Sequence, residues 1–516
     1  MIWKVWTILM ACLGLAWGSS ARADLPTQSS SAFPAEPAQK SFTAVDSLRQ
    51  MLLDVSNRID SGDKKGAQAL LLEITQNSAF DLLPDRQRYA VHLAYGALLS
   101  DAEAYGEAAV QLKAATAFDI ASSEAWRLRL DAAARLDDQP DEILAVTTVA
   151  KRWPEDLKQI DDDFLFRLHG RARQHDALLT TRIVMLQALS DAAWAPSNPF
   201  LDGDGLWLDL ANDLATKGQI KAAQAIAHKI KSAGIIAELL YTKRYDAITA
   251  ADPAFFNVAA ASARQADLLS SKARDLPDKL DGVNALALVL YKQGQFAQSL
   301  ALLDAAIALA RPIDGAKSPF TDMDQLIWTD DARAMALLAL GRTEEALAAY
   351  RAGAVQQERG QTNVSQSLNL AEILVNLGRP AEGLAIVPMV GGDLSPFGRM
   401  DREAITAEAY FQLHDVKKLQ ASLDYLKSHV DDAPTIVIQV LSDCGDEEGA
   451  AREAIRQLKD PYRQTAVLRL LQGNPEPPSA SPLILRSGRL KAALGKRADV
   501  QAAVDRVGRI LFIPLY

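Results

Sequence analysis

Three consecutive carboxylates, Asp161, Asp162 and Asp163, form the strongest candidate metal ligand set in the chain. Carboxylate oxygens are the ligands that Ca²⁺ and Mg²⁺ prefer in proteins. The same residues also suit the first turn of a helix, where negative charge faces the positive end of the helix dipole. We favour this second interpretation, with the helix beginning near Phe164.

A second possible calcium loop runs from Asn198 to Asp209, with Asp202 and Gly203 near its centre. Phe200 occupies a position that should supply an oxygen ligand, which argues against calcium. His169 and His175 are six residues apart and therefore do not share a helix face. The sequence predicts no metal ion and no cofactor.

Motifs for nucleophilic or phosphate chemistry are absent from the sequence, since it contains no GxxxxGK[ST], HExxH, GxSxG or CxxC pattern. Soluble lytic transglycosylases also carry a long helical superstructure, but the Glu-Ser pair and the G-L-M-Q-type stretch of their catalytic domain are not found. Cys444, in Ser-Asp-Cys-Gly, is interpreted as structural filler at the end of a helix. We therefore expect that the protein is not an enzyme.

The first 23 residues resemble a secretory signal peptide. A positive start, Met1–Lys4, precedes the apolar run Val5–Gly18, and Ala21-Arg-Ala23 predicts cleavage after Ala23. The apolar run is too short to span a membrane comfortably. Leu9–Cys12 loosely resembles a lipoprotein processing site, and lipidation of Cys12 stays open. Export without a retained anchor predicts a periplasmic location in a Gram-negative source.

Composition favours an acidic, all-α protein. The 516 residues carry a formal net charge of −10, which argues against nucleic acid as the main partner. Apolar residues make up 49% of the chain and aromatic residues only 6%, so Ala and Leu supply most of the core. Alternating apolar runs bounded by turn signals are missing, and no sheet is expected.

A helical-hairpin period of 34 residues is visible in the first half of the chain. Ala108 lies 12 residues after Gly96, Trp126 lies 18 residues after Ala108, and Pro154 lies 28 residues after Trp126. These offsets match two consecutive units of the pattern W-x2-L-G-x2-Y, A-x3-F, P, and the chain resembles the tetratricopeptide repeat (TPR) family over most of Val45–Ile513.

The resemblance implies an all-α solenoid, a right-handed superhelix of about ten to twelve hairpins with a concave groove lined by each first helix. The family's groove positions carry over to Glu124, Arg127, Asp131, Ala134, Arg135, Asn284, Tyr291, Lys292, Glu372 and Asn376. Their mixed charges fit either a groove for a protein partner or a plain solvated face. No paired Lys/Asn pattern recurs, so a clamp for acidic C-terminal tails is not expected.

Further hairpin turns follow one form, in which a glycine closes the first helix and a small residue comes five positions later. Glycine suits this place because the left-handed conformation there disfavours a Cβ. The signature residues of the later repeats are Trp207, Ala223, Gly294, Gly341 and Ala346. A turn is also expected at Gly495, and His414 stands where glycine is usual.

The predicted organisation has seven parts. They are a signal peptide (1–23), a flexible Pro-containing leader (24–44), three sets of repeats (45–194, 204–310 and 327–473), a Pro-rich link (474–482) and a capping helical hairpin (483–516).

The final hairpin is the one basic segment, with seven Lys or Arg against two Asp from Leu483 to Tyr516. It either docks on the acidic array as the cap that a solenoid needs, or contacts a membrane or partner. The sequence thus predicts a scaffold or adaptor of the cell envelope that binds a protein through its groove. The alternative is an architectural subunit of an envelope assembly or export complex, held through this hairpin. The oligomeric state is open.

Overall fold

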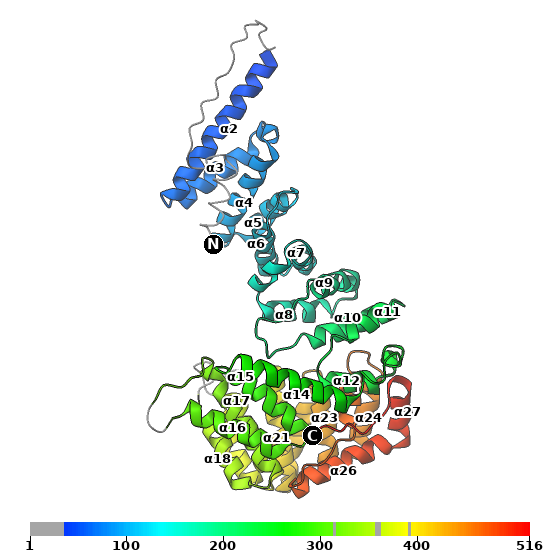
Figure 1. Cartoon of the computed structure of the whole chain (residues 1–516). Helices are drawn as coiled ribbons and strands as arrows, with labels where there is room; N and C mark the ends of the chain where they lie inside the picture. The colour runs from blue at the N-terminus through cyan, green and yellow to red at the C-terminus, as the bar shows by residue number, and fades with distance from the viewer. Residues whose placement is uncertain (1–35, 313–315, 357–362, 391–393) are drawn as a thin grey trace. The chain divides into compact units, whose positions relative to one another are not determined.

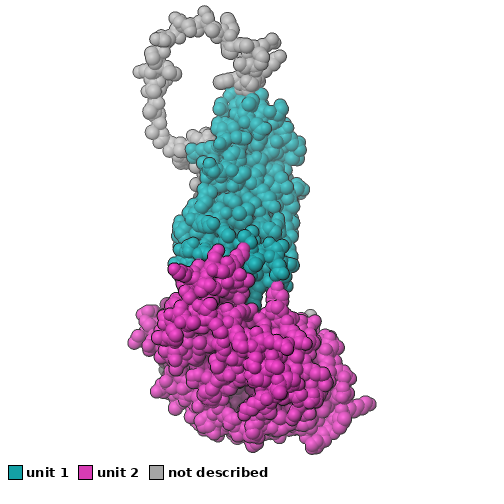
Figure 2. Space-filling view, turned by 90° about the vertical axis from the view of Figure 1, so that its right-hand side faces the viewer, with its two compact units in different colours: residues 1–197 teal, residues 198–516 magenta. Residues whose placement is uncertain are grey.

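The computed structural model describes residues 36–312, 316–356, 363–390 and 394–516. The predicted signal peptide, Cys12 and most of the leader lie outside these ranges. The chain divides into two compact units after Ser197, inside the loop between the first two predicted sets of repeats (Figure 1, Figure 2).

The first unit consists of helical hairpins in which each helix packs on its neighbours in sequence. Its helices are α2 (Glu36–Asp60), α3 (Lys64–Gln76), α4 (Asp85–Asp101), α5 (Tyr105–Thr116), α6 (Ser123–Arg135), α7 (Gln139–Arg152), α8 (Asp162–Ala172) and α9 (Leu179–Asp191). Short 3₁₀ turns join some of them, at Phe80–Leu82, Pro154–Gln159 and Asp176–Leu178.

The end of the predicted flexible leader is helical, because α2 begins at Glu36. Pro37 lies in the first turn, where its missing N–H costs no helical hydrogen bond. The residues after it are free of proline and lead into an amphipathic stretch whose Leu48, Leu52 and Val55 are buried. The prediction of a flexible leader relied on the prolines and did not identify the helix that begins at Glu36.

The second unit holds a longer set of helices. They are α10 (Asp204–Thr216), α11 (Ile220–Ala227), α12 (Ala233–Tyr241), α13 (Asp246–Thr249), α14 (Val258–Asp275), α15 (Leu280–Lys292), α16 (Phe296–Ala310), α17 (Leu326–Ala339), α18 (Thr343–Ala354), α19 (Val364–Asn376), α20 (Pro380–Ile386), α21 (Pro396–Gln412), α22 (Val416–Ser428), α23 (Pro434–Asp443), α24 (Glu447–Leu458), α25 (Gln464–Leu471), α26 (Pro482–Lys496) and α27 (Ala498–Val507). The remaining 3₁₀ turns are Lys243–Tyr245, Met323–Gln325 and Val387–Met389.

The predicted all-α solenoid is confirmed. Among the described residues there is no β-strand, and the only ladder contacts are two isolated bridges, Thr242 to Gly508 and Gly473 to Phe512. No helix within these ranges is both long and apolar enough to cross a membrane.

The hairpin turns use the left-handed conformation that the sequence pattern predicts. Positive φ angles occur at Gly62, Gly218, Gly294, Gly341, Gly378 and Gly445. His414, in the place of a glycine, also has a positive φ of 57°. The turn expected at Gly495 lies two residues later, at Arg497 between α26 and α27; Gly495 itself is helical, and a Cβ there would come within 2.9 Å of Ile510 Cδ1.

The residues of the repeat signature lie at helix–helix contacts. A Cβ on Gly96 would lie 2.6 Å from Leu112 Cγ on the paired helix. Ala108, Ala223 and Ala346 have no exposed surface. Trp126 and Trp207 are likewise buried, and Pro154 begins a 3₁₀ turn after α7.

Ala346 offers a test of this packing. Ala346→Leu should destabilise the second unit by about 1–3 kcal/mol, because extra volume at a filled helix crossing forces the helices apart. Ala348→Leu, on the exposed side of the same helix, is the matched control and should leave the melting temperature nearly unchanged. Equal melting curves for the two variants would contradict the assigned crossing point.

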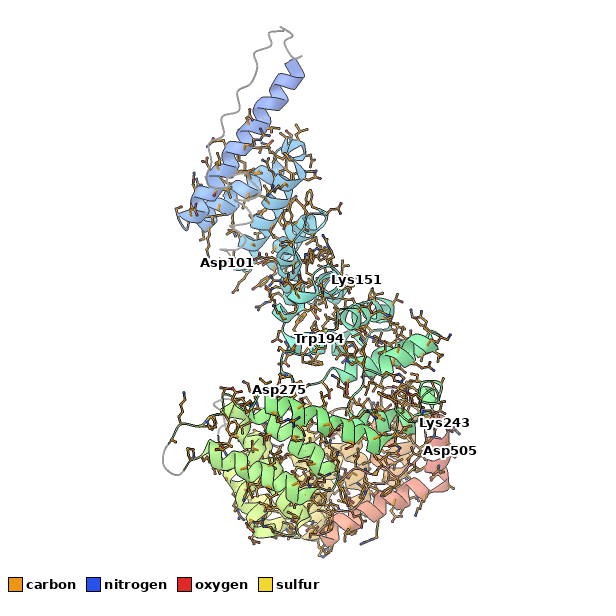
Figure 3. All side chains as sticks on the ribbon, in the orientation of Figure 1. Asp101, Lys151, Trp194, Lys243, Asp275 and Asp505 are labelled. Carbon is orange, nitrogen blue, oxygen red and sulfur yellow. The ribbon has the colours of Figure 1, made fainter. Side chains whose placement is uncertain are left out.

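Helices α25 and α27, with the residues after α27, close the second unit on α12 and the residues that follow α12. Arg469 of α25 pairs with buried Glu238 of α12 at 2.5 Å. The Arg509 guanidinium donates to both carboxylate oxygens of Asp246 at 2.8 and 2.6 Å, and its backbone N–H donates to the Tyr241 carbonyl. Lys243 Nζ donates to the Asp505 carbonyl, and both residues are labelled in Figure 3. The segment expected to act as a cap therefore contacts α12 and the residues after it.

Candidate binding site

The groove positions of the first unit lie on one face of α6. Glu124, Arg127, Asp131 and Arg135 are spaced three or four residues apart, while the opposite face buries Trp126 and its neighbours against α5 and α7. The Asp131 and Arg135 side chains are 49% and 61% exposed, and their ion pair is long at 4.0 Å. These side chains are therefore accessible to a ligand.

Arg127 adds an incompletely satisfied cation to this face. Its Nε is buried and has no hydrogen-bond partner among the described residues. Arg135 lies over the ring of Tyr105 at 5.6 Å from the centroid. The face thus presents an exposed carboxylate between two guanidinium groups, a pattern suited to binding charged or hydrogen-bonding groups of a peptide.

The groove positions on α15 are partly occupied by the chain's own C-terminus. Asn284 donates to the Gln325 carbonyl at 3.3 Å, and the Lys292 carbonyl accepts the backbone N–H of Tyr516 at 2.9 Å. The Tyr291 ring packs edge-on against Phe296, which also contacts the ring of Tyr516. The Lys292 carbonyl and the Phe296 ring therefore hold Tyr516 in place, while Asn284 binds the 3₁₀ turn before α17.

The C-terminal segment, residues 471–516, lies against three of the hairpin turns. Tyr516 lies against Gly294, Ser479 against Gly341, and Leu483 against Gly378. These glycines belong to the turns after α15, α17 and α19. The absence of a Cβ lets the segment approach closely, since a Cβ on Gly294 would come within 2.7 Å of the Tyr516 ring.

Hydrogen bonds fix the same segment to the ends of α19 and α23. Ser481 Oγ donates to the Asn376 carbonyl at 2.6 Å. Arg486 donates to the Asp443 carbonyl at 2.8 Å, and Ser487 Oγ donates to Asp443 Oδ2 at 2.9 Å.

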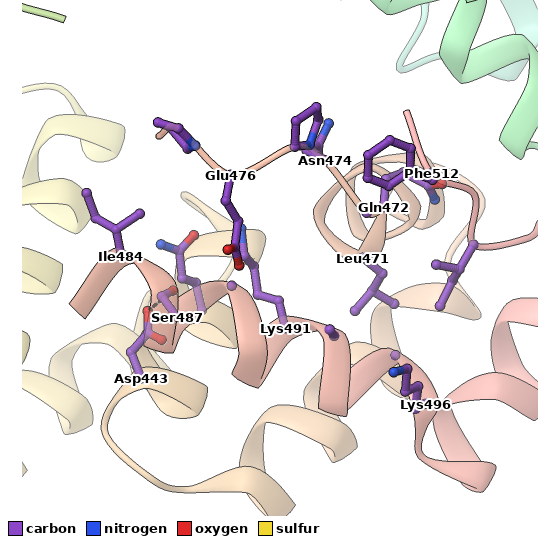
Figure 4. Close-up of a pocket in the computed structure, with 18 of the residues that line it drawn as sticks. Asp443, Leu471, Gln472, Asn474, Glu476, Ile484, Ser487, Lys491, Lys496 and Phe512 are labelled. Carbon is purple, nitrogen blue, oxygen red and sulfur yellow. Dashed lines mark hydrogen bonds between the residues drawn. The ribbon is translucent and has the colours of Figure 1, made fainter. Parts of the chain in front are cut away.

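A cavity of about 650 Å³ lies between the repeats and this C-terminal segment (Figure 4). The wall from the repeats consists of Glu372, Asn376, Glu408, Gln439 and Asp443. The other wall comes from residues 471–477, α26, Gln501 of α27 and residues 510–512. The sequence prediction brought Glu372 and Asn376 to this inner face, whereas the structure adds Glu408, Gln439 and Asp443.

Burial in the cavity wall disfavours ionisation of its carboxylates. Burial, reinforced by the charge of Asp401, raises the pKa of Glu372 to about 7. Burial, reinforced by Asp443, Glu372 and Asp401, raises the pKa of Glu408 to about 8. Glu372 is nevertheless reached by solvent, because its surroundings are an open cavity and not a packed core.

The stability of the second unit should depend on the protonation of Glu408. Its folded-state pKa lies above the ordinary glutamate value, so ionisation weakens the folded state as pH rises through about 8. Glu408→Gln should match the wild type near pH 5 and be more stable at pH 9. After screening by solvent in the cavity, we expect a gain on the order of 1 kcal/mol.

Melting temperatures at pH 5, 7 and 9 measure this difference. Glu447→Gln, at an exposed carboxylate in the first turn of α24, is the control. A constant difference between Glu408→Gln and the wild type at all three pH values would contradict the shifted pKa.

The candidate metal residues have structural roles. Asp161 Oδ1 accepts the Phe164 N–H at 2.8 Å as the N-cap of α8, as the helix interpretation predicts. In the second possible loop, Asp204 Oδ2 accepts the backbone N–H groups of Lys231 and Ser232 at 2.7 and 2.6 Å. Within the described ranges, no three His, Cys, Asp or Glu residues form a group that could hold a metal ion.

Cys444 lies at the end of α23, and burial raises the pKa of its thiol to about 12. A thiol that stays protonated at neutral pH is a poor nucleophile, in keeping with its interpretation as structural filler.

No protein-family model and no curated protein sequence matches the chain. Among solved structures, the chain is similar to one in the crystal structure of the APC/C hetero-tetramer Cut9–Hcn1, with 13% identity and a TM-score of 0.28, covering 91% of this chain and 93% of that one. It is also similar to a chain of Naa15/Naa10 bound to HypK-THB, with 14% identity and a TM-score of 0.22, covering 87% and 68%. These values assign no family or function, and the solenoid fold rests on the helices described above.

A repeat signal in the sequence points to the cavity wall. Glu408 follows Glu372 by 36 residues, and Asp443 follows Glu408 by 35, close to the hairpin period. Each lies on the first helix of its hairpin. The prediction applied the family's groove positions to the α19 hairpin but not to the more divergent hairpins that follow, and so missed the later two carboxylates.

Proposed function

We propose that this protein is an exported protein-interaction scaffold of the cell envelope, and that it binds a protein partner through the exposed face of α6. The charged row of Glu124, Arg127, Asp131 and Arg135 carries this proposal, with Asp131 and Arg135 exposed and the other two half-buried. The TPR resemblance supports it, because the family binds proteins through these positions. The signal peptide predicted for residues 1–23 is the ground for proposing export to the periplasm.

The inner positions of the second unit are poorer candidates for a protein partner. The Lys292 and Asn376 carbonyls already accept hydrogen bonds from the C-terminal segment. A protein ligand there would first have to displace that segment, whereas the α6 face binds without such a rearrangement.

Charge reversal on α6 tests the proposal. The mature chain carrying Arg127→Glu and Arg135→Glu should lose a discrete partner that the wild type captures from its native envelope. Lys151→Glu, at an exposed lysine on the second helix of the same hairpin (Figure 3), is the control and should retain the partner. Equal capture by all three proteins would exclude this face.

An architectural role through the basic C-terminal hairpin is the second candidate. Arg489, Lys496 and Arg506 are exposed and make no ion pair among the described residues. Reversing these three charges leaves the closing contacts of Arg469 and Arg509 intact. Loss of membrane-fraction association in this variant, with partner capture unchanged, would favour the architectural role.

A further inference from the structure

The residues that line the cavity of the second unit carry an excess of negatively charged groups. Its lining includes four carboxylates, from Glu372, Glu408, Asp443 and Glu476, against two ammonium groups, from Lys491 and Lys496. The wall formed by the repeats is acidic or amide throughout, and both lysines of the lining, labelled in Figure 4, come from α26. The repeat wall therefore lacks a cation of its own.

One carboxylate oxygen in this wall is left without a partner. Asp443 is 9% exposed, and its Oδ2 accepts from Ser487, but its Oδ1 is buried and has no hydrogen-bond donor among the described residues. A buried acceptor that has no donor destabilises the folded state. Asp443 lines the cavity, so a donor bound there would lie beside this unpaired acceptor.

The charged groups around Glu408 also favour a positively charged ligand. The groups that act on it are Asp443 of α23, Glu372 of α19 and Asp401 of α21, all of which are carboxylates. Asp331 of α17 extends this effect to Glu372, where the Asn376 side chain supplies a compensating hydrogen bond. A positively charged hydrogen-bond donor would be attracted by each of these groups.

We propose that the cavity binds an organic cation, a ligand whose amino or guanidinium group is held by Glu372, Glu408 and Asp443. Its volume of about 650 Å³ lies within the range of roughly 300–1,000 Å³ typical of small-molecule sites and far exceeds the space that a single ion needs. The amides of Asn376 and Gln439 supply hydrogen bonds for the body of the ligand. This site is separate from the α6 face and does not depend on the function proposed for it.

Two sources could supply this chemistry, a free polyamine or a lysine side chain on a peptide. Calorimetric titration of the mature chain with spermidine and with the tripeptide Gly-Lys-Gly, at pH 8.5, tests both. Binding of either one supports the proposal and identifies the source. The dianion glutarate, titrated under the same conditions, should not bind.

Variants locate the site. Glu408→Gln should weaken binding at least tenfold, and Glu372→Gln should weaken it as well, while Glu447→Gln on α24 should bind as the wild type does. Melting curves confirm folding, and the Gln variants are expected to be at least as stable as the wild type at this pH. No heat of binding for either cation at millimolar concentration, or affinities unchanged by Glu408→Gln, would overturn the proposal.

Discussion

Arg171→Ala should destabilise the first unit by about 3–5 kcal/mol, the cost of leaving a buried charge without its partner. Arg171 of α8 reaches back to the preceding hairpin, where it donates to Glu142 Oε2 at 2.5 Å and to Asp137. The Glu142 side chain has no exposed surface, and burial raises its pKa despite the nearby guanidinium. Removing the guanidinium leaves this carboxylate buried and unpaired.

Glu142 lies five residues after the left-handed Asp137. Seven other hairpins have a small residue at this position: Ala67, Ala108, Ala223, Ser299, Ala346, Gly383 and Ala450. The double variant Glu142→Ala and Arg171→Ala should therefore recover most of the lost stability. Arg167→Ala on the same helix, whose pair with Asp161 is exposed, should cost at most about 1 kcal/mol.

The penalty in Arg171→Ala should also depend on pH. Glu142 without its partner has a folded-state pKa raised further above the unfolded value, so the penalty is largest near pH 7 and shrinks as pH falls toward 4.5. Urea unfolding at pH 5 and 7 measures it. A loss of stability that is independent of pH, or no recovery in the double variant, would contradict this account of the pair.

Deleting Gly508–Tyr516 should destabilise the second unit by about 3–6 kcal/mol, since burying each large apolar side chain contributes about 1.5–3 kcal/mol. The segment buries Ile513 and Leu515, and it carries the Arg509 pair with Asp246 and the Tyr516 ring on Phe296. It also closes the unit, because Arg509 and Tyr516 contact α12 and the end of α15.

Hydrogen exchange should show the same effect locally, with protection lost at the end of α12 and in the turn after α15. Phe512→Ala lies within the deleted segment but replaces a side chain that is 68% exposed, so it should change the melting temperature little. Unchanged exchange at Thr242 in the deletion variant would show that the segment does not hold α12.

The solenoid could be predicted from the sequence because its signals are local. Gly294 and Gly341 close helices in a conformation that disfavours a Cβ, and Ala108 and Ala346 mark helix crossings. Such requirements fall on single residues at a fixed spacing, and they survive in divergent repeats.

The closure of the second unit could not be predicted in the same way. It depends on contacts between residues more than 200 positions apart, such as Arg469 with Glu238 and Arg509 with Asp246. Arginine, glutamate and aspartate are common surface residues, and the sequence around each one does not identify the residue with which it pairs. The role expected for Gly495 failed for a related reason, because that glycine lies in the last turn of α26 in close contact with Ile510, and the chain turns at Arg497 instead.

The candidate site was predicted in part. The groove positions implied by the TPR resemblance brought Glu372 and Asn376 to the inner face, but the cavity exists only because residues 471–477 and α26 cover that face. A local sequence pattern cannot predict that a segment distant in sequence will cover this wall of the repeats.

Site-directed photo-crosslinking in the native envelope tests the central claim, that the α6 face is the surface that binds a protein partner. A photoreactive amino acid would replace Asp131 on this face, Lys292 beside the C-terminal segment, or Val110, which is 64% exposed on the second helix α5. The account predicts a discrete protein adduct from position 131 and none from 292 or 110. An adduct from position 110 or 292 together with none from 131 would contradict it.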